Sequence, residues 1–277
     1  MKKNLTKLVV VLFITIMATG CRKDDNNDIP SSDYELSTDG KILVKWLNVE
    51  TTTINMQNDS KLKEVTTIGK EAFRLHEKLT SITFSENLKT IGEEAFFGTK
   101  LTEIVIPENV TLVQEEAFSK TDAVSATVKS NQVVFEKKVF SYSPKLKTVV
   151  FEKGINRLPF GTFHSCYVLE EVNFNDNVEI IGDVAFAQCH KIRNIKFAKN
   201  TTEFGEFVFS YCYEIRSIEI PFTRYGSTWF IPPIGIDPFW GLQKTQLPTI
   251  YVDRTLVDAY KETNVWKDYA DKIVAIP

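Results

Sequence analysis

Apolar side chains recur along this 277-residue chain in one frame that is repeated seven times. Each copy holds a Phe, usually preceded by Ala, and these residues are Phe73, Phe96, Phe118, Phe140, Phe163, Phe186 and Phe209. Successive residue numbers in this series differ by 23, 22, 22, 23, 23 and 23. Self-similarity at a period of this length is typical of a solenoid, in which stacked coils bury one continuous core.

The apolar positions on either side of each Phe predict two extended pieces per repeat. After the Phe, apolar residues follow with a three-then-two spacing, as in Leu146, Val149 and Phe151. The last two alternate with an outward residue, which is the period of a strand with one buried face. Five residues before each Phe stands another apolar residue, such as Ile91 or Ile181. We therefore expect short parallel strands stacked along the solenoid axis, with turns and short helical pieces between them.

Two further positions of the repeat predict turns. Gly follows the earlier apolar residue at Gly69, Gly92, Gly182 and Gly205, where we expect a positive φ. Asn follows the strand at Asn87, Asn109, Asn131, Asn177 and Asn200, with Gly154 in the remaining copy. Stacked Asn side chains are expected to bond turn groups of neighbouring coils and so form a ladder.

Three cysteines hold one common position, three residues after the Phe. Cys166, Cys189 and Cys212 follow one another at the repeat period, and His76 occupies the same position in the first copy. Buried thiols behave as small apolar residues, so we expect a buried stack. A bond between neighbouring coils remains the alternative. The chain contains no Cys-x-x-Cys, and we expect no metal site.

The pattern changes at both ends of the repeats, which occupy residues 65–220. Residues 34–64 are expected to be an N-terminal cap, with Trp46 covering the first coil rather than serving as a ligand platform. Residues 221–248 are rich in Pro and aromatic residues, and we expect a long loop that plugs the last coil or protrudes to bind a partner. Its candidate ligand residues are Trp229, Phe230, Phe239 and Trp240. Residues 249–277 are expected to form a C-terminal cap.

The first residues have the pattern of an export signal. Residues 1–20 carry Lys at positions 2, 3 and 7 and then a short apolar segment, which predicts a signal peptide. Ala18-Thr19-Gly20-Cys21 resembles the lipobox of bacterial lipoproteins, in which the Cys becomes lipidated. Residues 21–33 read as a flexible linker. The acidic run after Cys21 resembles the signal that sends some Gram-negative lipoproteins to the outer face of the outer membrane. The alternative is an ordinary secretory signal followed by a solvated tether.

Charge and candidate chemistry narrow the class of function. The net charge is −3 with both signs interspersed, which argues against a nucleic-acid partner. The three histidines, His76, His164 and His190, occupy different repeat positions, and no nucleophile motif is present. We therefore expect no enzymatic activity and no cofactor.

The repeat frame, Ile-Gly-x-x-Ala-Phe-x-x-Cys-x-x-Leu-x-x-Ile-x-Phe, resembles the BspA-type leucine-rich repeat. The match is best in residues 91–106 and 181–197, and residues 250–273 look like the end cap of that family's surface lipoproteins. The resemblance implies a leucine-rich-repeat solenoid of about seven repeats, right-handed and curved, capped at both ends. It also implies a cell-surface role in attachment or recognition, with no shared catalytic residues.

These observations predict a surface-anchored binding protein whose outward strand residues carry the site. Its partner would be a protein or glycan at the cell surface, with the membrane reached through the lipid anchor alone. The alternatives are a non-catalytic assembly subunit of an outer-membrane complex, or glycan capture for nutrient uptake. The outward residues could also be merely solvated. The candidate ligand face comprises Thr83, Glu103, Thr127, Lys129, Thr148, Glu152, Glu171, Asn173, Asn194, Lys196 and Glu219.

Overall fold

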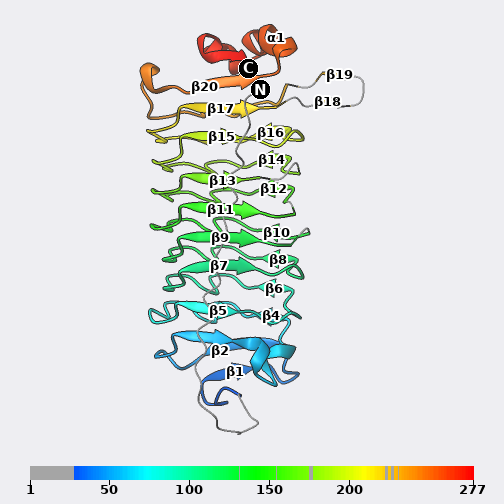
Figure 1. Cartoon of the computed structure of the whole chain (residues 1–277), viewed down its shortest axis with the longest axis vertical. Helices are drawn as coiled ribbons and strands as arrows, with labels where there is room; N and C mark the ends of the chain where they lie inside the picture. The colour runs from blue at the N-terminus through cyan, green and yellow to red at the C-terminus, as the bar shows by residue number, and fades with distance from the viewer. Residues whose placement is uncertain are drawn as a thin grey trace, which may run out of the picture.

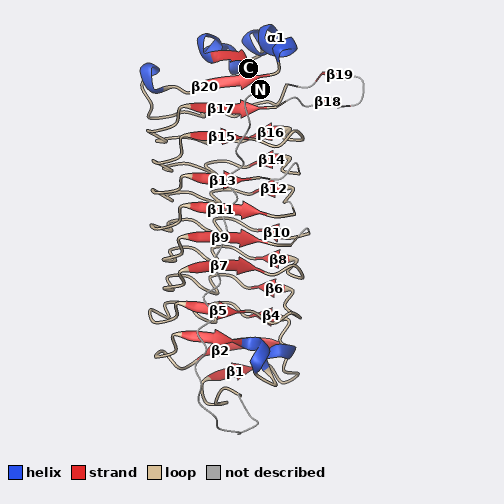
Figure 2. Ribbon diagram, in the orientation of Figure 1, coloured by secondary structure: helices blue, strands red, loops and turns tan. Residues whose placement is uncertain are grey.

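A computed structural model describes residues 28–130, 132–153, 155–174, 177–221, 224–225, 228–229 and 231–277. The leader with Cys21, and also Asn131, Gly154 and Phe230, lie outside the described residues. The chain is a leucine-rich-repeat solenoid, whose coils stack along the long axis of the molecule (Figure 1). Strands dominate the coils, and the helices lie near the two ends (Figure 2).

Two columns of short strands run along the stack, so that each regular coil contributes two strands. The strands of the first column, called the strand face, follow the repeat Phe residues, except that β3 precedes the first of them. They are β3 (Thr53–Asn55), β5 (Ser81–Thr83), β7 (Glu103–Ile106), β9 (Ser125–Val128), β11 (Thr148–Phe151), β13 (Glu171–Asn173), β15 (Asn194–Lys196), β17 (Ser217–Ile220), β20 (Thr249–Val252) and β21 (Ile273–Ala275). Pairing along this column is parallel, in the sheets β3-β5, β7-β9-β11-β13 and β15-β17-β20-β21.

The second column, called the arm sheet, precedes the repeat Phe residues. Its strands are β1 (Tyr34–Leu36), β2 (Ile42–Trp46), β4 (Thr67–Ile68), β6 (Thr90–Ile91), β8 (Leu112–Val113), β10 (Val134–Phe135), β12 (Arg157–Leu158), β14 (Ile180–Ile181) and β16 (Glu203–Phe204). Strand β1 is antiparallel to β2, whereas the later strands pair in parallel. Both extended pieces predicted for each repeat are therefore confirmed.

A column of aromatic rings runs through the core. The seven repeat Phe side chains are 0–1% exposed, which confirms the predicted core positions. Consecutive rings have centroids 4.9–6.0 Å apart, and most of these pairs are stacked. At the N-terminal end Trp46 stacks on Phe73 at 5.4 Å and Tyr34 stacks on Trp46 at 5.7 Å. Trp46 is 1% exposed, so it covers the first coil and is not a ligand platform.

The repeated Gly is explained by close approach of coils, and the expectation of positive φ there is wrong. Gly69, Gly92, Gly182 and Gly205 are absent from the residues with positive φ. A β-carbon on Gly92 would lie 2.7 Å from the carbonyl carbon of Gly69 in the preceding coil. Left-handed backbone instead occurs two residues before and two residues after each Phe, for example at Val184 (φ 48°) and Gln188 (φ 63°).

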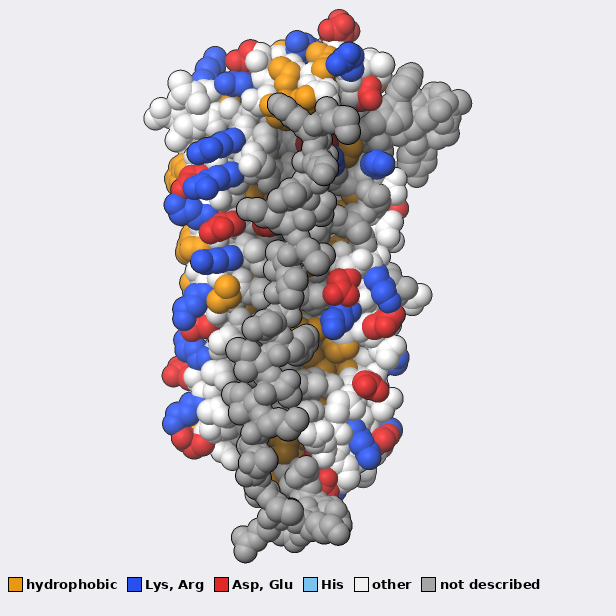
Figure 3. Space-filling model, in the orientation of Figure 1, with side chains coloured by type: hydrophobic (Ala, Val, Ile, Leu, Met, Phe, Trp, Pro, Cys, Tyr) orange, Lys and Arg blue, Asp and Glu red, His pale blue; other side chains and the backbone are white. Residues whose placement is uncertain are grey.

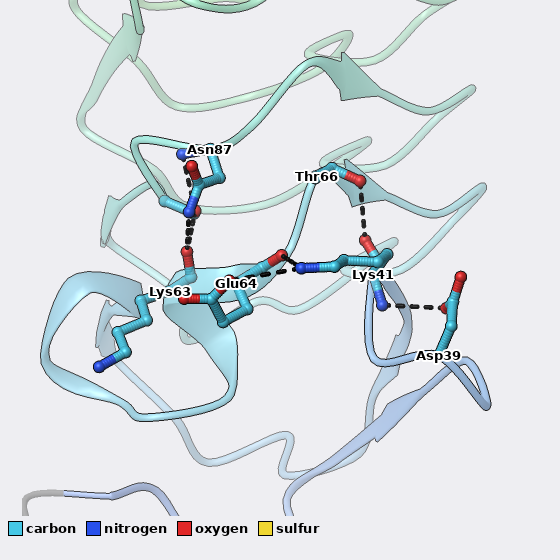
Figure 4. A network of polar contacts seen from close by, with 7 residues as sticks. Asp39, Lys41, Lys63, Glu64, Thr66 and Asn87 are labelled. Atoms are coloured by element: carbon cyan, nitrogen blue, oxygen red, sulfur yellow. Dashed lines mark hydrogen bonds and ion pairs between the residues drawn. The ribbon is translucent and has the colours of Figure 1, made fainter.

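Side chains join neighbouring coils as the sequence predicts for Asn. The Nδ2 atoms of Asn87, Asn109 and Asn177 donate to main-chain carbonyls of the preceding coil at 3.0, 2.9 and 3.4 Å. Figure 4 shows the Asn87 bond to Lys63, together with an ion pair between Lys41 and Glu64 of the next coil. The Asn ladder is confirmed at these three positions, and it satisfies turn carbonyls that stacking would otherwise leave unpaired.

The cysteine column is buried and reduced. Cys166, Cys189 and Cys212 are free and 0% exposed, which confirms the buried stack and leaves no bridge between coils. Each thiol donates to the carbonyl of the Phe in the preceding coil at 3.1–3.2 Å. Burial raises the pKa of Cys166 and of Cys212 to about 12. The cysteine position is therefore structural.

Residues 231–252 form an eighth coil, and the expectation of a plain loop over residues 221–248 is corrected in this part. The Phe239 ring stacks on Phe209 at 5.8 Å, and the main chain of Ile234 bridges in parallel to Phe204. Phe209 N–H donates to the Pro238 carbonyl at 2.8 Å, the same contact that joins earlier coils. An antiparallel pair, β18 (Arg224–Tyr225) and β19 (Thr228–Trp229), lies in the lengthened connection between Phe209 and Phe239. The 30-residue step between these two Phe hides the last repeat from a search at a period of 23.

The C-terminal end is closed by short helices. They are η3 (Lys244–Gln246), η4 (Arg254–Leu256), α1 (Val257–Glu262) and η5 (Trp266–Lys272), whereas η1 (Met56–Asn58) and η2 (Leu62–Glu64) lie at the end of the stack where the coils begin. Trp266 is 1% exposed and its Nε1–H donates to the Pro232 carbonyl at 2.8 Å, which fastens the cap to the eighth coil. Among the described residues, no helix has the length and apolar character needed to span a membrane.

Candidate binding surfaces

The strand face presents two columns of outward side chains in strict register. Strand pairing aligns Glu103, Ser125, Thr148 and Glu171 in one column and continues it with Asn194, Ser217 and Thr249. The second column aligns Val105, Thr127, Val150 and Asn173, and then Lys196, Glu219 and Tyr251. Successive side chains of a strand point to opposite faces, so the residues between these positions enter the core. Hydroxyl, amide and β-branched groups dominate both columns.

The structure places nine of the eleven predicted face residues on these two columns. Thr83 extends the second column at β5, opposite Asn55 of β3. Lys129 and Glu152 come directly after β9 and β11, so they lie beside the columns and not on them. Most of the eleven are exposed, while Thr127, Thr148 and Glu219 are half-buried between neighbouring strands.

Four residues of the two columns are charged, namely Glu103, Glu171, Lys196 and Glu219, and two of these form an ion pair with each other. Lys196 forms an ion pair with Glu219 of the next coil, and Ser217 donates to the Asn194 side-chain oxygen at 2.7 Å. Lys and Arg side chains gather instead along the left edge of the molecule (Figure 3). Lys191 and Arg193, in a turn that leads into the strand face, both pair with Glu214. The face itself therefore suits a partner recognised by hydrogen bonds and shape more than by charge.

A shallow hollow interrupts the face between β13 and β15. These two strands belong to different sheets, and a space of about 300 Å³ lies between them. It brings together four predicted residues, Glu171, Asn173, Asn194 and Lys196, with the half-buried Phe174 beside them. A similar hollow of about 350 Å³ lies between β10 and β12 of the arm sheet, where Val134 is 61% exposed.

A larger hollow of about 480 Å³, called the coil-eight hollow, lies beside the eighth coil, and two of the predicted loop residues, Phe239 and Trp240, line it. Trp240 is 54% exposed and lines it together with Tyr211, Asp237 and Tyr269. Phe239 also borders the hollow but is 3% exposed and belongs to the ring column, so its assignment as a ligand residue of a loop is corrected. Trp229 lies in β19.

Sequence reasoning missed Tyr211, Asp237 and Tyr269 because they come from separate parts of the chain. The sequence did contain a signal for Tyr211 and Asp237. Tyr211 and Gly241 each stand two residues after a column Phe, and Asp237 stands two residues before Phe239. Extending the frame to Phe239 would have placed the two coils side by side.

Aromatic side chains also form a ladder along the turns that lead into the strand face. Tyr167, His190 and Tyr213 occupy one repeat position in successive coils, with ring centroids 5.1 Å apart at each step. Burial lowers the pKa of His190, as it does for His76 and His164. The ladder rings contact one another in tilted pairs, and Tyr167 and Tyr213 remain 41% and 46% exposed. Within the described ranges, no group of three or more His, Cys, Asp and Glu residues could hold a metal ion.

The match to a family of known proteins agrees with this architecture. The family model described as "BspA type Leucine rich repeat region" matches in six copies, over residues 48–170 and 156–231. A solved leucine-rich repeat protein from Bacteroides ovatus is 18% identical, with a TM-score of 0.46 over 88% of this chain and 98% of that one. A leucine-rich cell surface protein from Faecalibacterium prausnitzii is 28% identical, with a TM-score of 0.45 over 75% of this chain and 55% of that one. The pneumococcal vaccine antigen PcpA is 17% identical, with a TM-score of 0.39 over 82% and 68% of the two chains. A search of curated proteins returns no significant match.

Proposed function

Because the chain belongs to the BspA-type leucine-rich repeat family, we propose that it is a surface-anchored binding protein that recognises a protein or glycan through its strand face. Extended solenoid surfaces suit large partners, because many weak contacts add along the stack. We assign no reaction to the chain. Its three histidines occupy different repeat positions, and the described residues contain no group of three or more His, Cys, Asp and Glu that could hold a metal ion.

The observation that carries the proposal is the register of the two outward columns. Nine predicted residues, contributed by seven strands, lie on one surface where each has a neighbour one coil away. Strand pairing is interrupted between β5 and β7 and between β13 and β15. Elsewhere neighbouring strands of the face pair with each other, so the outward side chains provide most of the specificity. Hydroxyl and amide groups outnumber charged groups on the two columns, which favours recognition by hydrogen bonds with geometric requirements.

The test compares charge-reversal variants of the strand face with a variant that carries an equal change of charge elsewhere on the molecule. The face variant is Lys129→Glu with Lys196→Glu, and its control is Lys89→Glu with Arg157→Glu, exposed residues before β6 and on β12. Purified proteins would be applied to an array of extracellular proteins and glycans, after circular dichroism has confirmed equal folding. We expect the face variant to lose about tenfold or more in affinity while the control stays near the native value. A face variant that binds every partner like the native protein would refute this assignment.

A pull-down from membranes separates recognition from assembly. Binding to several external proteins or glycans supports the recognition role. Recovery of one stoichiometric membrane protein, without external ligands, would instead support a non-catalytic subunit of an outer-membrane complex.

We further propose that the chain is lipidated at Cys21 and anchored at the outer membrane with its coils outside the cell. The lipobox-like Ala18-Thr19-Gly20-Cys21 and the acidic run that follows support this proposal. Mass spectrometry of the mature N-terminal peptide should find an acylated Cys21, and Cys21→Ala should release the protein from membranes. An unmodified peptide that begins elsewhere would contradict the anchor without affecting the strand-face proposal.

A further inference from the structure

The coil-eight hollow differs in chemistry from the strand face. Its walls are aromatic and aliphatic, with Tyr211, Trp240, Tyr269, Leu242 and Leu247 surrounding about 480 Å³. Small-molecule sites are concave, mostly apolar and completed by a few convergent polar groups. The strand face has the opposite composition, with many polar groups spread over a shallow surface. The two surfaces therefore suit different ligands.

The walls of the hollow are held by the solenoid and do not depend on a free loop. The Tyr211 N–H donates to the Trp240 carbonyl at 2.8 Å, which ties together the coils that contribute the two rings. Phe239 stacks on Phe209 and meets Tyr269 of η5 edge-to-face at 5.2 Å. A preformed site of this kind loses little conformational entropy when it binds a ligand.

One glycine gives the Tyr211 ring its place. Gly241 has φ +83°, and a β-carbon there would lie 2.5 Å from two atoms of the Tyr211 ring. The ring can therefore lie directly against the main chain beside Trp240. Trp240 meets Phe207 edge-to-face at 6.3 Å and remains 54% exposed, so its indole is accessible from the hollow.

The polar groups of the hollow carry both signs of charge. Asp237 and Lys244 both line it and are exposed, and Tyr211 and Tyr269 add phenol groups. The Tyr269 hydroxyl lies close enough to Asp237 for the carboxylate to help raise its pKa, after the larger effect of burial. A cationic ligand would meet Lys244, and an anionic ligand would meet Asp237. A neutral ligand that carries both hydrogen-bond donors and acceptors would meet favourable partners at both.

We propose that the coil-eight hollow binds a sugar ring of a neutral glycan. A pyranose has an apolar C–H face that can pack on Trp240 and Tyr211, and hydroxyl groups that can donate to Asp237 and accept from Lys244. The aromatic ring supplies contact area and its polar neighbours supply orientation. The neighbouring Tyr167–His190–Tyr213 ladder lies outside this hollow. This site is separate from the strand face and adds a second ligand class.

Oligosaccharide binding by hollow variants tests the assignment. The native protein would be applied to an array of neutral, acidic and basic oligosaccharides, followed by calorimetric titration of a bound glycan. We expect binding to neutral glycans, and Trp240→Ala should lower the affinity about tenfold or more because an aromatic contact surface is lost. Asp237→Asn should weaken binding less while leaving the aromatic walls intact. The matched control is Tyr142→Ala, which removes an aromatic side chain that is 41% exposed and outside the hollow, and it should bind like the native protein.

Two further measurements separate this proposal from the strand-face proposal and from a general loss of stability. Lys129→Glu with Lys196→Glu should leave the affinity for the glycan that depends on Trp240 unchanged. Trp240→Ala should leave the affinity for a strand-face partner unchanged, so failure of the strand-face proposal and failure of this one are distinguishable. Because Trp240 is exposed, its variant should keep the native thermal midpoint. The absence of binding to any neutral glycan, a preference for charged glycans, or native affinity in Trp240→Ala would each overturn the proposal.

Discussion

Replacing Gly182 with Ala tests why glycine recurs in this solenoid. A β-carbon at this position would lie 2.8 Å from the carbonyl carbon of Pro159, 2.9 Å from the Leu158 oxygen and 2.9 Å from the Phe160 nitrogen. Non-bonded carbon atoms prefer about 3.5–4.0 Å. All three atoms belong to the main chain of the preceding coil, so no side-chain rotation relieves the contact. The two coils would have to separate by roughly 0.7–1.2 Å at this point.

The expected change in the free energy of unfolding follows from two opposing effects. Overpacking of a close-packed interior costs about 1–3 kcal/mol. Ala also restricts the unfolded chain, which stabilises the folded state by about 0.4–1 kcal/mol. We therefore expect Gly182→Ala to lower the free energy of unfolding by about 1–2 kcal/mol. Urea titration followed by circular dichroism measures the change, and hydrogen exchange of the Gly182 N–H, bonded to Leu158 at 2.7 Å, locates it.

Two companion variants separate close approach from backbone conformation. Gln114 occupies the same repeat position and already carries a β-carbon, so Gln114→Ala should change the stability by less than about 0.5 kcal/mol. Asn tolerates positive φ far better than Ala does. If positive φ were the reason for glycine, Gly182→Asn would be close to native, whereas the contact argument makes it at least as destabilised as Gly182→Ala. A native-like Gly182→Asn would therefore refute the contact argument.

Three further predictions concern buried polar groups. Cys189→Ser should keep the free energy of unfolding within about 1 kcal/mol of the native value, because Ser143 already occupies the same repeat position. Burial raises the pKa of the Cys189 thiol, so the native protein should resist modification by maleimide. Its stability should fall as the pH rises above about 9, because the thiols of the unfolded chain ionise first. His76 is 5% exposed and burial lowers its pKa, so the unfolded state takes up its proton first. The stability of the native protein should therefore fall as the pH drops below 6.5. His76→Thr, which copies Thr99 at the same repeat position, should reduce the pH dependence of the urea midpoint measured from about pH 7.5 to 5. An unchanged slope of midpoint against pH would contradict this. Trp266→Phe should lower the free energy of unfolding by about 1–3 kcal/mol, because a buried carbonyl of the eighth coil loses its hydrogen-bond donor. Trp266→Ala should lower it by about 3–5 kcal/mol. Faster hydrogen exchange in the C-terminal cap is the readout for both variants.

The repeated core could be predicted from sequence because its causes are local to the repeat. Phe118 and Phe140 take the same position as their neighbours, and one period places every ring of the regular coils. The Asn ladder followed from the same argument. The role of the recurring glycine could not be predicted in this way. Gly92 lacks a β-carbon because the main chain of Gly69 lies directly against it, and this contact exists only after the coils have stacked.

The candidate sites were predictable to a smaller extent. Alternation along each strand identified outward residues such as Asn173 and Lys196, but the hollow between them depends on an interruption of strand pairing that no side-chain pattern records. Trp240 was identified from its Pro- and aromatic-rich surroundings. Its partners Tyr211 and Tyr269 come from another coil and from the cap, and only the closing of the eighth coil brings all three together.

The 30-residue step between Phe209 and Phe239 also bears on how such a chain can change length. The two rings stack at 5.8 Å, within the range of the regular coils, although the connection between them is longer than in any regular repeat. The additional residues have therefore been accommodated at this point without breaking the column. The connection after β17 is accordingly a natural insertion site for an epitope tag or fluorescent reporter, and a place where related chains can gain or lose segments during evolution.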